Sequence, residues 1–402
     1  MEGALQGVKV IDLGHWAAGP SACVILADWG AEVIKVEDPR GGDAFRGVTY
    51  PNIPRPPDIN IWFEQYNRNK KSVAVDLGHP RGREIVHRLV RDTDVLVTNF
   101  LPPVLKRYSV DYQSLRELNP RLIYAGVTGY GERGRDSDKP GYDFNAFWAR
   151  GGFMDLIAAP GAAPIPQRSG MGDNTIAMLV AGAICAALLF REKTGQGQEL
   201  AFSLFHTATW VLSMDIGLAL HAGVEIPKAD RLKATNPLRN SYRTKDGQWI
   251  WMMMLQSDRF WGRFCKAIGR EDLEHDPRFS SHQKRAENNE ALISIIDEVV
   301  AGRGWAEWDR VFTEQGLIYE RVHSVSDVVA DPQARENGFF TEVAHPVSGR
   351  VKLVASPVKF GVTPASVRCA APELGEHTEE VLLGMGYTWQ DIAGLKESKV
   401  IL

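Results

Sequence analysis

The chain has 402 residues, of which 44% are hydrophobic and 24% are charged, and its formal net charge is −4. A chain of this length exceeds a typical single hydrophobic core, so we expect two domains. The small negative charge argues against nucleic acid as a partner, and any anionic ligand must be met by local basic residues. The four cysteines form no CxxC or Cys/His pair. This pattern predicts reduced thiols in a cytoplasmic protein and no metal site.

The first two hundred residues alternate between short apolar runs and helical segments. A helix is expected between the first two runs, with Pro20 in its first turn and Gly30 at its end. A second helix is expected at 79–93, and the segment 136–152 is expected to be a loop. This order is typical of an open parallel sheet built from right-handed β-α-β units. The predicted strands are 8–13, 31–37, 71–77, 94–100 and 121–131.

From about residue 225 the pattern changes to that of a smaller α+β domain. A hairpin is predicted to turn at Asp246–Gly247, and 256–318 is helical and polar. A strand pair and a closing helix follow this region. We therefore expect a large α/β domain, a small domain and a C-terminal segment that returns to the large one. The corresponding ranges are 1–224, 225–325 and 326–402.

Asp173 stands just before fifteen uncharged, mostly apolar residues, Ile176–Phe190. Fifteen residues suit a buried helix, whereas a bilayer span needs about 20, so no membrane association is expected. Two roles remain open for Asp173. It is either the N-cap of the helix or a nucleophile that the helix N-terminus holds ionised. Gly172 before it has no Cβ that would obstruct a bulky substrate.

The first β-α-β unit ends in an acid, Glu37, as dinucleotide-binding units often do. The glycine fingerprint of such units is absent, because "GHWAAGP" stands in its place, so nicotinamide is not expected. The carboxyl ends of the strands nevertheless carry basic and ring-bearing side chains that suit a phosphorylated adenine nucleotide. Each of these side chains taken singly is more often an ordinary surface residue. They are His15, Trp16, Lys35, Arg40, Arg46, Lys70, Lys71, Lys106 and Arg107.

Ordered motifs along the whole chain carry a resemblance. "GVKVIDLGHWAAGP", "GAEVIKVEDPRGGDAFR", "NRNKKSVAVDL", "GMGD", "REKTGQGQ" and "LGEHTEEVLLGMGY" resemble the class III CoA-transferases. That family includes formyl-CoA transferase and carnitine CoA-transferase. Within it, "YDFNAFWARGG" and "NPLRNSYRTKDG" are most similar to transferases that act on phenyllactate and related 2-hydroxy acids.

The resemblance implies a site and an assembly. The family's catalytic aspartate falls on Asp173, and coenzyme A or its thioester is the substrate, with no tightly bound cofactor. The large domain would be a Rossmann-like open parallel sheet, and two chains would interlock as a homodimer. The implied coenzyme A contacts are His15, Trp16, Ala17, Ala18, Arg40, Val75, Asp76, Asn99, Phe100, Arg107 and Tyr142.

The implied reaction moves CoA between carboxylic acids through an anhydride and a CoA thioester on Asp173. The glycine-rich segment 149–152 is a candidate oxyanion site. Ala17 replaces a glutamine of formyl-CoA transferase, and a glycine-rich lid is missing, so formate and oxalate are not expected as substrates. The aromatic residues of 144–153 and Met252–Met254 would either form an apolar acyl pocket or pack in the core.

Two alternatives use the same fold. The α-methylacyl-CoA racemases pair the corresponding aspartate with a histidine, where this chain has Tyr142. A tyrosine with an unperturbed pKa near 10 is a poor base at neutral pH, although His15 is a possible substitute. An acyl-CoA isomerase would use Asp173 for an intramolecular CoA transfer.

Overall fold

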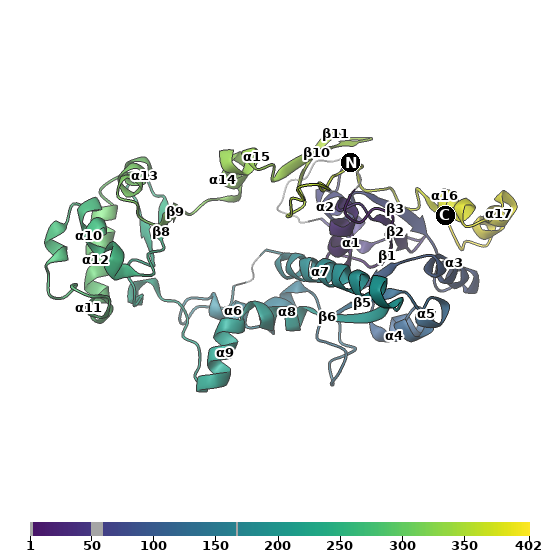
Figure 1. Cartoon of the computed structure of the whole chain (residues 1–402), viewed down its shortest axis with the longest axis horizontal. Helices are drawn as coiled ribbons and strands as arrows, with labels where there is room; N and C mark the ends of the chain where they lie inside the picture. The colour runs from purple at the N-terminus through teal and green to yellow at the C-terminus, as the bar shows by residue number, and fades with distance from the viewer. Residues whose placement is uncertain (1–2, 50–58, 166–167) are drawn as a thin grey trace. The chain divides into compact units, whose positions relative to one another are not determined.

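The computed structural model describes residues 3–49, 59–165 and 168–402 (Figure 1). The chain forms two compact units. The first comprises Met1–Asp155, Ile165–Ile226 and Arg335–Leu402, and the second comprises Leu156–Pro164 and Pro227–Ala334. The sequence predicts boundaries at 225 and 325, and it assigns Leu156–Pro164 to the large domain.

A six-stranded parallel sheet organises the first unit, which confirms the predicted α/β class. Its order is β3-β2-β1-β4-β5-β6, with Val10 of the central strand opposite Val33 and Val95. The apolar runs of the sequence become strands because both faces of the sheet are covered by helices. The strands are β1 (Lys9–Leu13), β2 (Glu32–Glu37), β3 (Lys70–Ala74), β4 (Val95–Thr98), β5 (Ile123–Thr128) and β6 (Gln198–Ser203).

Helices on the two faces bury separate apolar clusters. On one face α1 (Ala18–Asp28) packs against α7 (Met171–Thr194). On the other face α3 (Pro80–Arg91) and α5 (Tyr112–Leu118) share a core with the C-terminal helices α16 (Thr378–Gly384) and α17 (Trp389–Glu397). Figure 1 shows α16 and α17 beside α3, so the C-terminal segment completes the first unit. The unit also contains α2 (Ile61–Asn67), α4 (Pro102–Tyr108), α8 (Leu204–Val211), α9 (Ser213–Ala222), β10 (Phe340–His345) and β11 (Gly349–Val354). The short helix α6 (Phe153–Leu156) begins in this unit, and its last residue belongs to the second.

The strand order reverses direction next to β1. From β1 the chain moves outward to β2 and β3, and it then returns to place β4 on the other side of β1. The loops that leave β1 and β4 therefore diverge, and they open a crevice at the carboxyl ends of these strands. Ligands of open α/β sheets bind at this point.

Helix α7 is longer than its apolar run predicts, because it starts at Met171 and ends at Thr194. By length and composition alone, α7 is the one helix in the described ranges that could cross a membrane. A buried core helix meets the same two criteria. One face of α7, including Ile176, Val180 and Ile184, is buried in the same cluster as α1.

Two features of the first unit depart from the sequence-based expectation. The predicted loop 136–152 contains a π-helical segment, η2 (Asp143–Ala149). Pro140 and Gly141 led to the expectation of a loop. In the structure Gly141 packs closely on Gly129, because a Cβ added to Gly141 would lie 2.6 Å from the Gly129 Cα. Strand β6 was not predicted, because Gln198 and Glu199 give it a polar beginning.

The second unit has its own hydrophobic core and contains the predicted hairpin. Strand β7 (Ser241–Arg243) pairs antiparallel with β8 (Trp249–Met252), and Gly247 has a φ of 81° in the connecting turn. A third strand, β9 (Tyr319–Arg321), pairs with β8. The helices of this part are α10 (Ser257–Ala267), α11 (His282–Glu287), α12 (Asn289–Val300), α13 (Trp305–Glu314), α14 (Val325–Ala330) and α15 (Pro332–Glu336), the last of which continues into the first unit.

Candidate active site

A cavity of about 530 Å³ lies at the carboxyl ends of the parallel strands of the first unit. Each of the strands β1 to β5 ends in residues that line it. Examples are His15 after β1, Asp38 after β2, Val75 after β3, Asn99 after β4 and Thr128 at the end of β5. The cavity therefore occupies the crevice that the strand order creates.

Asp173 and ten of the eleven residues that the resemblance implies for coenzyme A line this one cavity. Arg107 does not line it. Its guanidinium lies on the exposed end of α4, 5.7 Å from the ring centroid of Tyr108, and Tyr108 does line the cavity. The ten lining residues are His15, Trp16, Ala17, Ala18, Arg40, Val75, Asp76, Asn99, Phe100 and Tyr142.

Several lining residues were not singled out from the sequence. Four of them could have been found from the sequence, because each follows or ends a strand or lies in a glycine-containing turn: Asp43, Thr128, Gly129 and Gly141. Tyr108 had none, because it lies inside a helix that the sequence did not predict. Across the described ranges, no group of three or more His, Cys, Asp or Glu side chains is arranged to hold a metal ion.

Asp173 is not the N-cap of α7, so the first of its two open roles is excluded. The cap position is Gly170, whose φ of 86° suits glycine, and Asp173 is the third residue of the helix. The capping carboxylate is Asp143, whose two oxygens accept hydrogen bonds from the backbone N–H groups of Gly170 (2.6 Å) and Gly172 (2.9 Å). Because Asp143 satisfies these donors, the structure does not need a carboxylate at Asp173 as a cap.

The electrostatic surroundings of Asp173 make it an unusually basic carboxylate. Burial, and secondly the negative charge of Asp143, raise the pKa of Asp173 to about 7. Burial also raises the pKa of Asp143, although backbone N–H groups act against this shift. A carboxyl with a strongly raised pKa in a cavity is a candidate for catalysis, because its basicity matches neutral pH.

Gly172 serves a different purpose from the one expected. A Cβ on Gly172 would lie 2.4 Å from Asp143 Oδ1 and 2.5 Å from Phe147 Cγ. The side of Gly172 that would carry a Cβ is therefore already in contact with the capping residue and η2. The absence of a Cβ allows α7 to approach Asp143 closely. It does not make room for a substrate.

The residues suggested for the acyl pocket and the oxyanion site do not line this cavity. Phe147 and Trp148 are buried in the core of the first unit, and Phe147 stacks on Phe153 with 4.8 Å between ring centroids. Met252 and Met254 are buried in the core of the second unit. Segment 149–152 contributes no residue to the cavity lining. The aromatic residues that do line the cavity include Trp16 and Tyr142, whose rings meet edge to face at 6.1 Å.

Proteins with similar sequences show the family of this chain. The family model described as "CoA-transferase family III" matches residues 5–378. The chain is 35% identical to (R)-2-hydroxy-4-methylpentanoate CoA-transferase of Clostridioides difficile, over 99% of both chains. It is also 35% identical to cinnamoyl-CoA:phenyllactate CoA-transferase of Clostridium sporogenes, over 99% of this chain and 97% of that protein.

A solved structure supports the same assignment. A CAIB/BAIF family protein from Brucella suis superimposes with a TM-score of 0.84 at 30% identity, covering 96% of this chain and 100% of that chain. The family match spans both compact units, and the relatives are enzymes that use CoA thioesters. The chain therefore belongs to CoA-transferase family III and is an enzyme of that family.

Proposed function

We propose that this enzyme transfers CoA from an acyl-CoA to a free carboxylic acid, with Asp173 as the nucleophile. One observation carries the proposal. The carboxylate of Asp173 has a raised pKa and no capping role, and it lines the cavity at the point where the strand order of the sheet reverses. A CoA-transferase must keep the acyl group activated, because hydrolysis by water would waste the energy of the thioester. A carboxylate nucleophile meets this need.

The proposed chemistry has four steps. A carboxylate oxygen of Asp173 attacks the thioester carbonyl, the C–S bond breaks, and an acyl–aspartyl anhydride and CoA thiolate form. The thiolate then attacks the aspartyl carbonyl, which releases the donor acid and leaves an aspartyl–CoA thioester. The acceptor carboxylate attacks this thioester to give a second anhydride and free the thiolate. Attack of the thiolate on the acceptor acyl carbonyl yields the new acyl-CoA and regenerates Asp173.

Cavity residues would bind the CoA part of the substrate. Arg40 at the cavity edge is exposed and donates two hydrogen bonds to Asp38, and the remaining N–H groups of its guanidinium would bind a phosphate. Arg107 stacks over Tyr108 at the rim and is a second candidate for a phosphate contact. The apolar residues Val104 and Phe100 would shield the adenine or pantetheine part from water.

The acids exchanged are proposed to be monocarboxylic 2-hydroxy acids with an apolar group. Two relatives are named for such acids, 2-hydroxy-4-methylpentanoate and phenyllactate. In this chain, Trp16 and Tyr142 give the cavity an aromatic edge that suits a branched alkyl or aryl group.

The test is a transfer assay with a panel of acyl-CoAs and free acids, read by mass spectrometry of new thioesters. We expect new thioesters from phenyllactate and 2-hydroxy-4-methylpentanoate, and little product from oxalate or formate. Hydroxylamine added during turnover should trap the activated carbonyl and give a mass-shifted peptide that contains Asp173. Absence of any new thioester across the panel would contradict the proposal.

A second candidate is exchange of the proton on the carbon next to the thioester. His15 lines the same cavity as Asp173, and burial lowers its pKa, so a neutral imidazole is available as a base. Incubation of a chiral 2-methylacyl-CoA in deuterium oxide separates the two functions. Deuterium uptake as fast as CoA transfer would favour this candidate, and an unlabelled substrate would favour transfer. An intramolecular transfer needs a CoA thioester whose acyl group carries a second carboxylate. With such a substrate it would show as an isomerised thioester formed without an added acid.

We also propose that the enzyme works as a homodimer. The first unit exposes large apolar side chains along α7, α8 and α9, which is unusual for a monomer surface. They include Met178, Leu189, Phe190, Trp210, Met214, Leu218 and Leu220.

A further inference from the structure

In the loop that follows β1, Gly14–Trp16, the backbone is bound by side chains that lie outside the loop. Gly14 N–H donates to Asp12 Oδ1 (3.1 Å), and Gly14 C=O accepts from Lys35 Nζ (2.9 Å). His15 N–H donates to Asn99 Oδ1 (3.0 Å), and His15 C=O accepts from Asn99 Nδ2 (2.8 Å). Trp16 N–H donates to Asp43 Oδ1 (2.9 Å). Five successive polar groups of the backbone are thus bound one by one.

This loop needs such support because its conformation is strained. Trp16 has a φ of 62°, in the left-handed region that residues with a Cβ avoid. The cost is roughly 1–2 kcal/mol for an L-residue. Strain of this kind persists only where surrounding groups impose it, and it is concentrated at functional sites.

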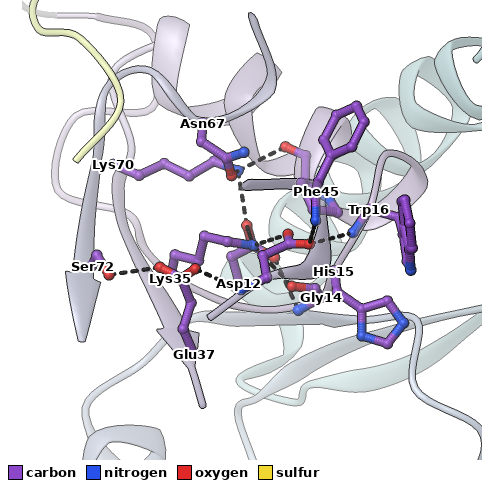
Figure 2. Close-up of polar contacts among 12 residues, drawn as sticks. Asp12, Gly14, His15, Trp16, Lys35, Glu37, Phe45, Asn67, Lys70 and Ser72 are labelled. Carbon is purple, nitrogen blue, oxygen red and sulfur yellow. Dashed lines mark hydrogen bonds and ion pairs between the residues drawn. The ribbon is translucent and has the colours of Figure 1, made fainter. Parts of the chain in front are cut away.

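Asn99 supplies two of the five bonds, and buried charged side chains supply the other three (Figure 2). Lys35 Nζ lies 2.9 Å from Asp43 Oδ2 and 3.7 Å from Asp12 Oδ2, and all three side chains are almost inaccessible to solvent. Burial acts against the charge on Lys35, but Asp12, Asp43 and Glu37 more than offset it and raise its pKa above the ordinary value. Lys70 Nζ donates to the other side of the cluster, at 2.8 Å from Asp12 Oδ2.

Stability alone does not account for this cluster. Well-packed apolar residues in place of a buried ion pair are often neutral or stabilising, because desolvation of the charges costs several kcal/mol. What this cluster adds is geometry. In Figure 2 the rings of His15 and Trp16 point away from the charges, and both residues line the cavity that contains Asp173.

We propose that Lys35 and Asp43 are positioning residues whose buried ion pair holds the Gly14–Trp16 backbone in the conformation that binds acyl-CoA. The ligand part of this inference rests on the proposed function. The mechanical part, that the pair fixes the loop, does not. Lys35 does not line the cavity and acts only through the loop, whereas Asp43 also lines it. Hydrogen exchange of the loop therefore separates positioning from a direct contact of Asp43 with the ligand.

The test compares two charge-balanced double variants. The first, Lys35→Met with Asp43→Asn, removes the pair that contacts the loop. The matched control, Arg68→Met with Asp28→Asn, removes another buried pair of the same unit, at 2.8 Å, that does not line the cavity. For each protein we would measure acetyl-CoA affinity by calorimetry, KM and kcat for transfer, thermal stability, and amide hydrogen exchange of the peptide that spans 9–22.

The loop variant should bind acetyl-CoA about tenfold or more weakly, with KM raised more than kcat is lowered, and the amides of residues 14–16 should exchange faster. The control should lose stability to a similar degree but keep its affinity within about twofold and its loop exchange unchanged. Equal loss of affinity in both variants, or unchanged exchange in the loop variant, would overturn the inference. If the wild-type protein binds no acetyl-CoA, the proposed function fails, and the exchange comparison still decides the positioning role.

Discussion

Two aspartates divide tasks that the sequence suggested for one. Asp143 caps α7 from a segment outside the helix, and Asp173 in the first turn is left with no capping bond. The negative charge of the cap then contributes to the raised pKa of Asp173. Capping and proposed catalysis are therefore coupled through charge but rest on different residues.

Replacement of Asp173 by asparagine should separate activity from stability. Asn lacks the charged oxygen that attacks the thioester, so transfer should fall by at least about a thousandfold. The folded state raises the pKa of Asp173 from 3.8 to about 7, so it favours the protonated form. That contribution to stability is complete below the unfolded pKa and is lost as the pH rises through about 7. Asp173→Asn should therefore unfold at a higher temperature than the wild type at pH 8 and at nearly the same temperature at pH 4. A variant that is stable and still transfers CoA would contradict the proposed nucleophile.

The pH dependence of transfer should show the same group. Only the ionised form of Asp173 attacks, so kcat/KM should rise with pH and level off above a midpoint of about 7. Asp143→Asn keeps a capping acceptor but removes the nearby charge, so its midpoint should lie at lower pH. A pH–rate profile from pH 5 to 9 measures both midpoints. Identical midpoints in the two proteins would show that Asp143 does not tune the nucleophile.

The strain at Trp16 is measurable with a pair of variants. Trp16→Ala and Trp16→Gly both remove the ring, but only alanine has a Cβ at the left-handed φ of 62°. Trp16→Gly should therefore be the more stable by about 1 kcal/mol in urea unfolding, although glycine is the less stabilising residue elsewhere. Equal stability, or a more stable alanine variant, would mean that the loop is not strained there.

At the scale of elements, the seating of α7 depends on close packing at its first turn. An added methyl group on Gly172 would meet Asp143 and Phe147, so Gly172→Ala should destabilise the protein by about 1–3 kcal/mol and reduce transfer. Gly182 in the same helix has open space around the added Cβ, so Gly182→Ala should instead stabilise it by about 1 kcal/mol. Chemical denaturation of the two variants checks both signs. A neutral Gly172→Ala variant would show that the helix can move away from its cap.

Strand positions were predictable because parallel strands are buried on both faces and show as apolar runs. The same reasoning predicted where the site lies, because ligands of parallel sheets bind at the carboxyl ends of the strands. The individual residues came from the family resemblance, and ten of those line the cavity. The cap of α7 was not predictable, because Asp143 is remote in sequence from Gly170 and only the fold brings them together. The sequence did not show whether the aromatic residues Phe147 and Trp148 contact the ligand or pack in the core, and in the structure both are buried in the core.

At the scale of the whole molecule, the first unit exposes large apolar side chains that do not pack in its own core. Met214 and Leu220 on α9 are 88% and 82% exposed. Isolated apolar residues are common on protein surfaces, but a run of them along neighbouring helices is typical of an interface. The relatives give this surface no role by name, so its role in assembly stays a proposal for this chain.

Met214→Glu with Leu220→Glu should therefore weaken the proposed homodimer. Two carboxylates placed opposite apolar side chains of a partner would have to be buried without counter-charges, which costs several kcal/mol. Sedimentation velocity should show a dimer for the wild type and a shift toward monomer for the double variant at micromolar concentration. Val347→Glu, in the turn between β10 and β11, changes an exposed apolar residue that has no such neighbours on a helix, and it should leave the dimer intact. A wild-type protein that sediments as a monomer would refute the proposed dimer, and the α9 surface would then need another partner.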